Sequence, residues 1–132
     1  MNHELTRMNT NSLVHKELSY RIIGLAMEVH SNLGPGFLEK VYENALMVLM
    51  RREGITAEQQ AAVKVMFEGE VVGEYFADIL VDNQIILELK AADQITNIHK
   101  AQTFNYLKAT GHRLGIILNF GAKHLEHHRI VL

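Results

Sequence analysis

The sequence predicts an α/β fold in which a mixed central β-sheet is flanked by helices. Two stretches, 18–33 and 37–53, have the apolar spacing of amphipathic helices. A β-rich region begins at residue 60, and a helical segment separates it from two more strands. Consecutive strands joined by short turns form an antiparallel meander, whereas a strand, a helix and a second strand imply a parallel pair. The expected order is therefore helix, helix, three strands, helix, two strands.

Turn residues define the ends of the two N-terminal helices. The first helix carries its apolar residues from Leu18 to Leu33 and ends at 34–36, which reads Gly-Pro-Gly. Proline cannot continue a helix, and glycine allows the chain to change direction sharply. The second helix starts near Phe37, and Gly54 closes it after two basic residues.

The remaining elements follow from apolar runs and the turns between them. The segment 68–70 reads Glu-Gly-Glu, a turn that joins the first two strands. Asp93 can cap the third helix, which runs to Thr110 and ends at Gly111. The run 114–120 is wholly apolar apart from one asparagine, which indicates a buried central strand. The expected strands are 61–67, 71–81, 84–90, 114–120 and 125–131.

Length and composition are those of one compact domain. The chain has 132 residues, 48% of them hydrophobic and 21% charged, which suits a single core. We expect a loosely ordered segment over 1–14 and one domain over 15–132. Cysteine is absent, so disulfides and thiolate metal sites are excluded. Without a signal-peptide pattern or an apolar run long enough to cross a bilayer, we expect a cytoplasmic protein with no membrane partner.

The charge balance limits how the chain can bind nucleic acid. It has 13 lysines and arginines against 15 acids, a formal net charge of −2. Phosphate contacts from basic residues supply much of the affinity of DNA-binding proteins. This balance therefore argues against tight, autonomous binding to a duplex.

Three charged residues in two apolar strands form the candidate site. Asp78 interrupts the first strand, while Glu88 and Lys90 lie two residues apart on the next and so point to the same face. Charges on such hydrophobic strands are costly to bury unless they pair or hold a metal ion. Two carboxylates can hold a hard cation, and an ammonium group can position an attacking water. The alternative is a solvated Glu88–Lys90 pair on an exposed face.

The length of the turn between these strands decides whether the site can form. A strict two-residue loop, 82–83, would place Asp78 opposite Leu87 and on the other face from Glu88. A shared site therefore requires a loop of odd length or a bulge between Ile79 and Ile86.

The strand motif resembles the PD-(D/E)xK nuclease superfamily, with Asp78 and the run Glu88-Leu89-Lys90 as its core. The run 36–42, Gly-Phe-Leu-Glu-Lys-Val-Tyr, is similar to the motif that names the GxxExxY family of that superfamily. The resemblance implies that Glu39 lies beside the metal, directly or through water, with Tyr42 as a supporting residue. It also implies that the carbonyl of Leu89 is a metal ligand. The alternative for Glu39 is a first-turn acid that favours the helix dipole.

The third helix carries a further feature, Gln102 and Tyr106 one turn apart on the same face. This QxxxY spacing, directly after the Glu-x-Lys strand, resembles RecB-like nucleases and implies that both residues support the site. The alternative is a half-buried polar pair that packs against the sheet.

The hypothesis that these observations favour is a nuclease dependent on Mg²⁺ or Mn²⁺. Asp78, Glu88, Glu39 and Lys90 are its candidate catalytic residues, in a restriction-endonuclease-like fold. Its partner would be nucleic acid, DNA rather than RNA, bound weakly unless a homo-oligomer or a partner subunit contributes. The alternatives are a non-catalytic module of a nucleic-acid-processing complex, and a purely structural oligomer.

Overall fold

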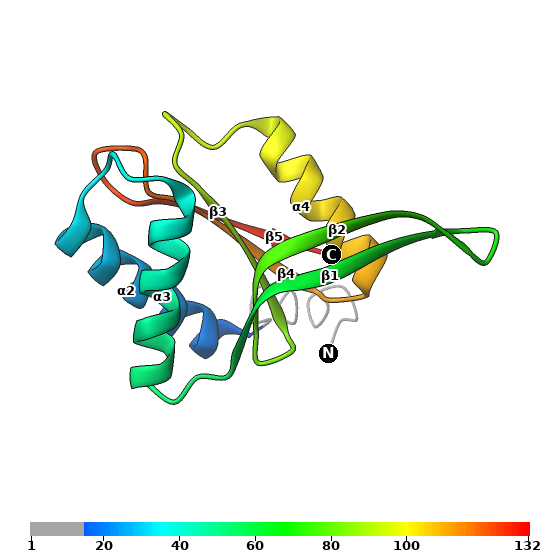
Figure 1. The fold of residues 1–132 in the computed structure, drawn as a ribbon, viewed down its shortest axis with the longest axis horizontal. Coiled ribbons are helices and arrows are strands. Elements are labelled where there is room, and N and C mark those ends of the chain that lie inside the picture. The colour runs from blue at the N-terminus through cyan, green and yellow to red at the C-terminus, as the bar shows by residue number, and fades with distance from the viewer. Residues whose placement is uncertain (1–14) are drawn as a thin grey trace, which may run out of the picture.

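The computed structural model describes residues 15–132, and the expectation for 1–14 lies outside the described residues. The order of elements confirms the predicted α/β arrangement (Figure 1). The elements are α2 (Lys16–Leu33), α3 (Glu39–Arg52), β1 (Ala57–Phe67), β2 (Glu70–Val81), β3 (Ile85–Lys90), α4 (Asn97–Thr110), β4 (Leu114–Asn119) and β5 (Glu126–Val131).

The five strands form one mixed sheet in the order β1-β2-β3-β4-β5. The pairs β1–β2, β2–β3 and β4–β5 are antiparallel, and β3–β4 is parallel, with α4 as the crossover. The predicted meander and the predicted parallel pair are both confirmed. Every residue of β4 is buried, which agrees with its expected central position.

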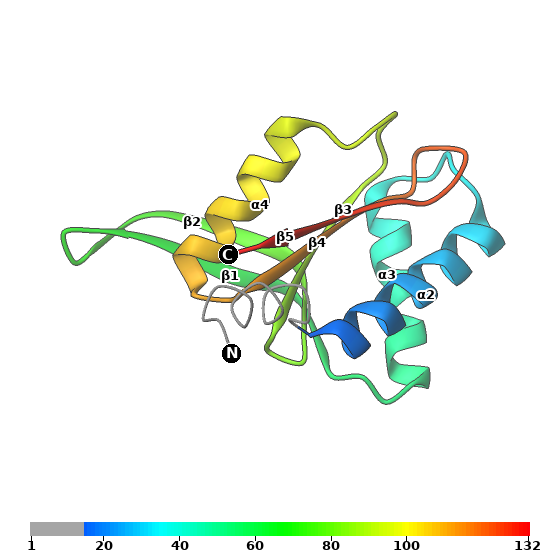
Figure 2. The same ribbon diagram turned by 180° about the vertical axis from the view of Figure 1, so that it is seen from behind.

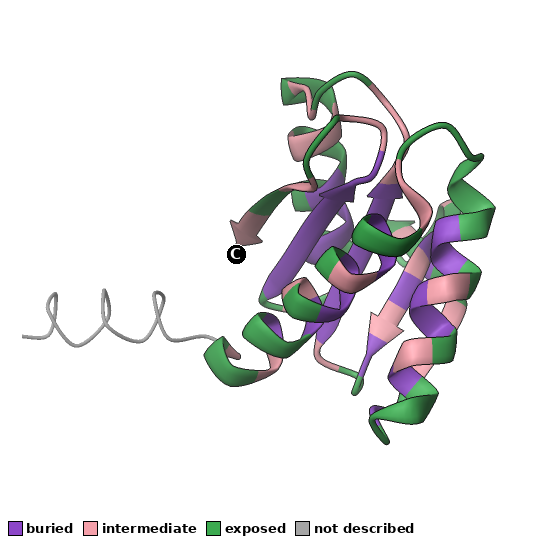
Figure 3. Ribbon diagram, turned by 90° about the vertical axis from the view of Figure 1, so that its left-hand side faces the viewer, coloured by how far each residue is buried: buried purple, intermediate pink, exposed green. Residues whose placement is uncertain are grey.

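Helices cover both faces of the sheet (Figure 2). The larger core packs α2 and α3 against one face, where alternate residues such as Ile79, Leu87 and Ile116 point. The smaller core packs α4 against the opposite face, where Ile86 and Leu107 meet. Figure 3 shows the buried strands enclosed between helices whose outer surfaces are exposed. None of the helices in the described part of the chain is long and apolar enough to cross a membrane.

The turn between β2 and β3 has the odd length that a shared site requires. It contains three residues, 82–84, because Val81 pairs with Ile85 and Ile79 with Leu87. Asp82 and Asn83 both adopt positive φ angles, 51° and 52°, which aspartate and asparagine tolerate better than most residues. Continuing this register places Asp78 opposite Glu88 and on the same face.

The connection between α2 and α3 explains much of the Gly-x-x-Glu-x-x-Tyr spacing. Gly36 has a φ of 113°, which residues with a side chain rarely adopt. The Tyr42 hydroxyl donates to the Gly34 carbonyl oxygen at 2.6 Å and accepts from the Phe37 backbone nitrogen at 3.1 Å. Its ring stacks on Phe120 with centroids 4.6 Å apart. Tyr42 therefore ties the loop to the core.

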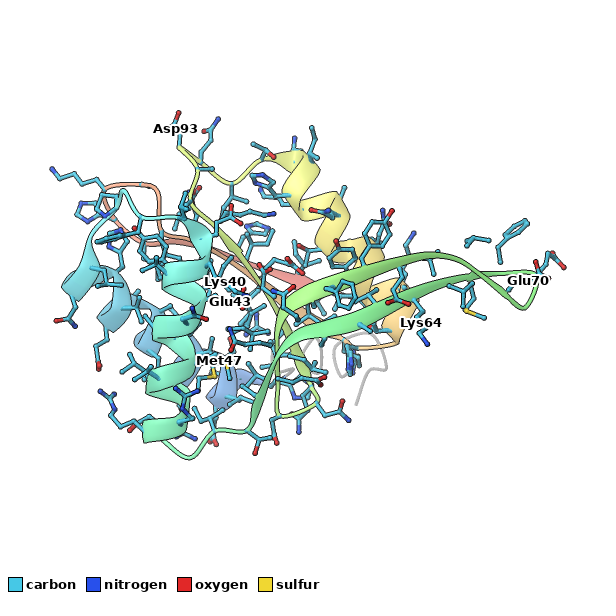
Figure 4. The ribbon with its side chains drawn as sticks, in the orientation of Figure 1. Lys40, Glu43, Met47, Lys64, Glu70 and Asp93 are labelled. Carbon is cyan, nitrogen blue, oxygen red and sulfur yellow. The ribbon has the colours of Figure 1, made fainter. Side chains whose placement is uncertain are left out.

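The predicted cap of α4 is wrong. Thr96, rather than Asp93, precedes the helix and accepts a hydrogen bond from the His99 backbone nitrogen, while the His99 ring accepts from the Thr96 nitrogen. Asp93 is exposed and lies at the outer tip of the loop between β3 and α4 (Figure 4). The helix therefore begins three residues later than the sequence suggests. Its predicted end at Gly111, with a φ of 80°, is confirmed.

The outer halves of β1 and β2 form an arm that extends beyond the rest of the sheet (Figure 1). β2 pairs with β3 only over 79–81, whereas its pairing with β1 continues to the Phe67–Glu70 turn. The arm therefore begins next to Asp78, the residue of β2 that directly precedes the pairs with β3.

Candidate active site

Asp78 lies at the point where β2 and β3 diverge. The last backbone pair between the two strands is Ile79–Leu87. One residue further on, the Oδ2 atom of Asp78 accepts a hydrogen bond from the Leu89 backbone nitrogen at 2.7 Å. The Asp78 carboxylate thus takes the place of a backbone carbonyl as the acceptor for Leu89. This hydrogen bond holds Asp78 at the edge of β3.

Glu88 faces Asp78 from β3 and is nearly enclosed, with 5% of its surface exposed. Its Oε1 atom is buried and lacks a hydrogen-bond partner within residues 15–132. A buried polar atom without a partner costs free energy, and most such atoms in folded proteins are paired. This atom is therefore available to a ligand that residues 15–132 do not provide.

Burial and the charges of neighbouring acids raise the pKa values of both carboxyl groups. Burial raises the pKa of Glu88 to about 9, and the neighbouring Asp78 charge adds to the shift, while Lys90 opposes it. The pKa of Asp78 is also raised by burial, although the hydrogen bond from Leu89 lowers it and Glu43 raises it again. Without a cation, the pair therefore holds a proton on Glu88 at neutral pH.

Lys90 completes the strand motif on the same face as Glu88, and its charge acts on both acids.

A hydrogen-bond network around Asn119, the last residue of β4, orders the chain that follows β3. The buried Asn119 side chain accepts from the Ala92 nitrogen at 2.9 Å, donates to the Ala92 carbonyl at 2.9 Å and donates to Glu126 at 3.0 Å. Because β3 and β4 run in register here, with Lys90 opposite Asn119, this network holds the exit of β3 in place.

The helix acid nearest to the carboxyl pair is Glu43 rather than Glu39. Glu43 is 4% exposed and accepts hydrogen bonds from Lys40 at 2.9 Å, Gln59 at 2.6 Å and Gln60 at 3.1 Å. Figure 4 shows Lys40 and Glu43 on the side of α3 that faces the β1–β2 hairpin. Glu43 also contributes to the raised pKa of Asp78.

Glu39 and Tyr42 do not join the acids as expected. Glu39 is exposed in the first turn of α3, one turn before Glu43 on the same side of the helix. Tyr42 is buried in the core on the opposite face of the sheet from α4. The sequence shows acids at both helical positions, and only the path of β1 beneath the helix distinguishes them.

Two glutamines that the sequence did not single out also lie at the site. Gln59 is partly buried and Gln60 is exposed on β1, and Gln60 has a φ of 54° within the strand. Gln60 lies directly opposite Asp78, between the backbone pairs Gln59–Ile79 and Ala61–Ala77. Such strained residues cluster at functional sites. The signal that the sequence offered for these two residues was a pair of adjacent glutamines where the β-rich region begins.

Tyr106 lies beside the carboxyl pair, on the α4 side. Tyr106 is buried, and burial followed by the charges of Glu88, Tyr75 and Asp78 raises the pKa of its phenol, while a side-chain hydrogen bond with Gln102 lowers it. Tyr106 therefore lies close to Glu88, whereas Gln102 is exposed.

The donor set fits a magnesium-like cation with an incomplete protein shell. In residues 15–132, no three histidine, aspartate or glutamate side chains form a group that could hold a metal ion, so the expected convergence of three acids is not observed. Mg²⁺ is usually bound through one or two carboxylates, with water and substrate oxygens as its other ligands. The buried, unpartnered Glu88 oxygen beside a second carboxylate meets this requirement.

Comparisons with known proteins concern the fold and the family of the chain. No curated protein matches the chain. Among solved structures it is similar to "Crystal structure of SSO0001", with a TM-score of 0.55 and 19% identity, over 70% of this chain and 50% of that one. The chain thus spans about half the length of that protein, and the likeness shows the fold alone. The order and sheet are those of a restriction-endonuclease-like fold. The profile of the PD-(D/E)XK nuclease superfamily matches residues 16–130, and the chain belongs to that superfamily.

Proposed function

We propose that this chain is a divalent-metal-dependent nuclease that hydrolyses phosphodiester bonds of nucleic acid. The observation that carries the proposal is the meeting of Asp78 and Glu88 where β2 and β3 diverge, with a buried Glu88 oxygen that has no partner in the described chain. A cation can replace the shared proton and satisfy this oxygen.

In this proposal, Asp78 and Glu88 bind Mg²⁺ or Mn²⁺ together with the Leu89 carbonyl. The N–H and C=O groups of one strand residue point to the same side. Because the Leu89 N–H is directed at Asp78, its carbonyl faces the same opening. The metal ion would polarise the phosphoryl group and lower the pKa of a bound water.

Lys90 is the residue that we expect to orient the attacking water and stabilise charge on the phosphoryl oxygen. Its position two residues after Glu88 on the same face supports this role. Glu43 holds the β1 amides and contributes negative charge next to Asp78. We propose that it takes the role that the GxxExxY resemblance assigned to Glu39.

Gln102 and Tyr106 would support the site from α4, in the manner that the RecB-like spacing implies. In this proposal Tyr106 closes one side of the carboxyl pair and limits the access of water, which would strengthen electrostatic interactions within the site. We further propose that residues 15–132 act as one domain and that the substrate is DNA rather than RNA. The net charge of −2 favours a homo-oligomer or a partner subunit as a source of additional binding surface.

The test is cleavage of plasmid and single-stranded DNA by purified protein with Mg²⁺, with Mn²⁺ and with a chelator. We expect cleavage only with metal. Lys90→Ala and Asp78→Ala should each reduce the rate by about 100-fold or more, the scale for removing a charge-stabilising group. Lys123→Ala, which removes an exposed lysine from the β4–β5 loop, is the matched control and should cleave like wild type.

Equal rates for wild type, Lys90→Ala and Asp78→Ala at matched folding would refute the enzymatic proposal. The absence of any cleavage, together with a stoichiometric protein partner recovered by pull-down, would instead favour a non-catalytic interaction module.

A further inference from the structure

A groove lies next to the carboxyl pair, between the β1–β2 arm and α4. Its volume is about 880 Å³, within the range of pockets that hold small organic ligands. We call it the tyrosine groove, and its principal lining residues are Tyr75, Ile98, Gln102, Asn105, Tyr106 and Lys108. Tyr106 and Gln102 belong to both the groove and the candidate active site, so the two are continuous.

The α4 side of the groove is built from one face of the helix, since its lining residues recur at spacings of three and four. A helix face that served only the core would be buried, yet Ile98 is 79% exposed. Across the groove, Tyr75 is 49% exposed, and its ring lies 5.6 Å from that of Tyr106. One accessible aromatic ring, Tyr75, thus lies against the buried ring of Tyr106 beside the acids.

The chemistry of the walls suits an unpaired nucleobase. Aromatic side chains stack on any base, and exposed amides such as Gln102 and Asn105 can hydrogen-bond with base edges. In a duplex the bases are already stacked inside the helix, and binding depends on phosphate contacts with basic residues. Among the described residues that line the groove, Lys108 is the one cationic side chain, and a single positive charge is too little for duplex binding.

We infer that the tyrosine groove binds an unpaired base of single-stranded nucleic acid and thereby sets the strand beside Asp78 and Glu88. We expect Tyr75 to determine the preference for single strands, because its ring is accessible and lies outside the carboxyl site. The inference deepens the proposed function by naming its substrate class. Base binding itself does not require the cleavage reaction.

Fluorescence anisotropy in the presence of a chelator tests binding without catalysis. The probes are a labelled single-stranded DNA, the RNA of the same mixed sequence, and the DNA duplex. We expect both single strands to bind at least about tenfold more tightly than the duplex. Tyr75→Ala should weaken single-strand binding by about 5- to 150-fold, the range for loss of one stacked base.

Two variants serve as controls. Tyr75→Phe keeps the ring and should bind like wild type, which a role of the hydroxyl group alone would not predict. Tyr20→Ala removes an exposed tyrosine of α2, away from the groove, and should also bind like wild type. Circular dichroism of each variant verifies that the fold is intact.

The inference is overturned if the duplex binds as tightly as the single strands, or if Tyr75→Ala leaves single-strand affinity unchanged. It is also overturned if sedimentation shows that Tyr75→Ala only dissociates a dimer, since the groove would then join two copies of the chain. Lys90-dependent cleavage with no effect of Tyr75→Ala would sink this inference and leave the proposed function standing. Tyr75-dependent binding without cleavage would do the reverse.

Discussion

Replacing Glu88 with glutamine should stabilise the metal-free protein while it removes a candidate cation ligand. Glu88 is buried beside Asp78, and its pKa rises from 4.5 to about 9 on folding. Between these pH values, the folded protein binds a proton that the unfolded chain releases. The contribution of Glu88 to the stability of the folded state is therefore largest below pH 4.5 and falls as the pH rises.

The magnitude follows from the size of the shift. Each pH unit in this window costs about 1.4 kcal/mol, so ionisation of Glu88 in the unfolded chain lowers the free energy of unfolding at pH 7 by about 3 kcal/mol. Glutamine has a similar shape and no proton to lose. Glu88→Gln should recover much of this free energy and flatten the dependence on pH, leaving the smaller contribution of Asp78, whose pKa is also raised.

Urea unfolding followed by circular dichroism, at several pH values between 5 and 8.5 and with a chelator, measures both effects. Glu58→Gln is the matched control because Glu58 is exposed on β1, and it should change stability by less than about 0.5 kcal/mol. A Glu88→Gln protein that is no more stable than wild type at pH 7, with the same slope against pH, would refute the assignment of a buried, protonated carboxyl group.

Two further predictions concern the packing that supports the site, and urea unfolding tests both. Tyr42→Phe removes the hydroxyl that bridges two loop groups but keeps the stacked ring. It should lower the free energy of unfolding by about 1–2 kcal/mol. Tyr20→Phe, at an exposed position, should leave the free energy of unfolding almost unchanged. Gly121→Ala would place a Cβ against the backbone oxygen of Ala92, in the loop after β3, and should lower the free energy of unfolding by about 2 kcal/mol or more. Gly24→Ala, with open space around it, should instead raise the free energy of unfolding by about 0.5–1 kcal/mol. Equal effects within either pair would contradict the packing described.

The sequence was sufficient for the features that depend on local periodicity and parity. The alternation of side chains along β2 and β3 required an odd turn if Asp78 was to meet Glu88, and the turn 82–84 has that length. The parallel pairing of β3 and β4 followed from the helix between them. These arguments need only residue spacing and the geometry of strands.

The choice between neighbouring residues of the same type depended on contacts that spacing does not contain. Glu39 and Glu43 occupy one side of α3, and only the passage of β1 beneath the second makes it the buried acid. Similarly, Asp93 and Thr96 are both good helix caps, and the hydrogen bonds between Thr96 and His99 in the folded chain show which one begins α4. Contacts made in the folded chain distinguish the residues in both cases.

Calorimetric titration of the protein with Mg²⁺ tests the central claim that Asp78 and Glu88 hold a cation in place of a proton. At pH 7, titrations in two buffers of different ionisation enthalpy should show one saturable site and release of about one proton per ion, because Glu88 must give up its proton to bind the metal. Asp78→Asn should abolish the binding heat. Saturable binding without proton release, or identical binding by Asp78→Asn, would contradict the account.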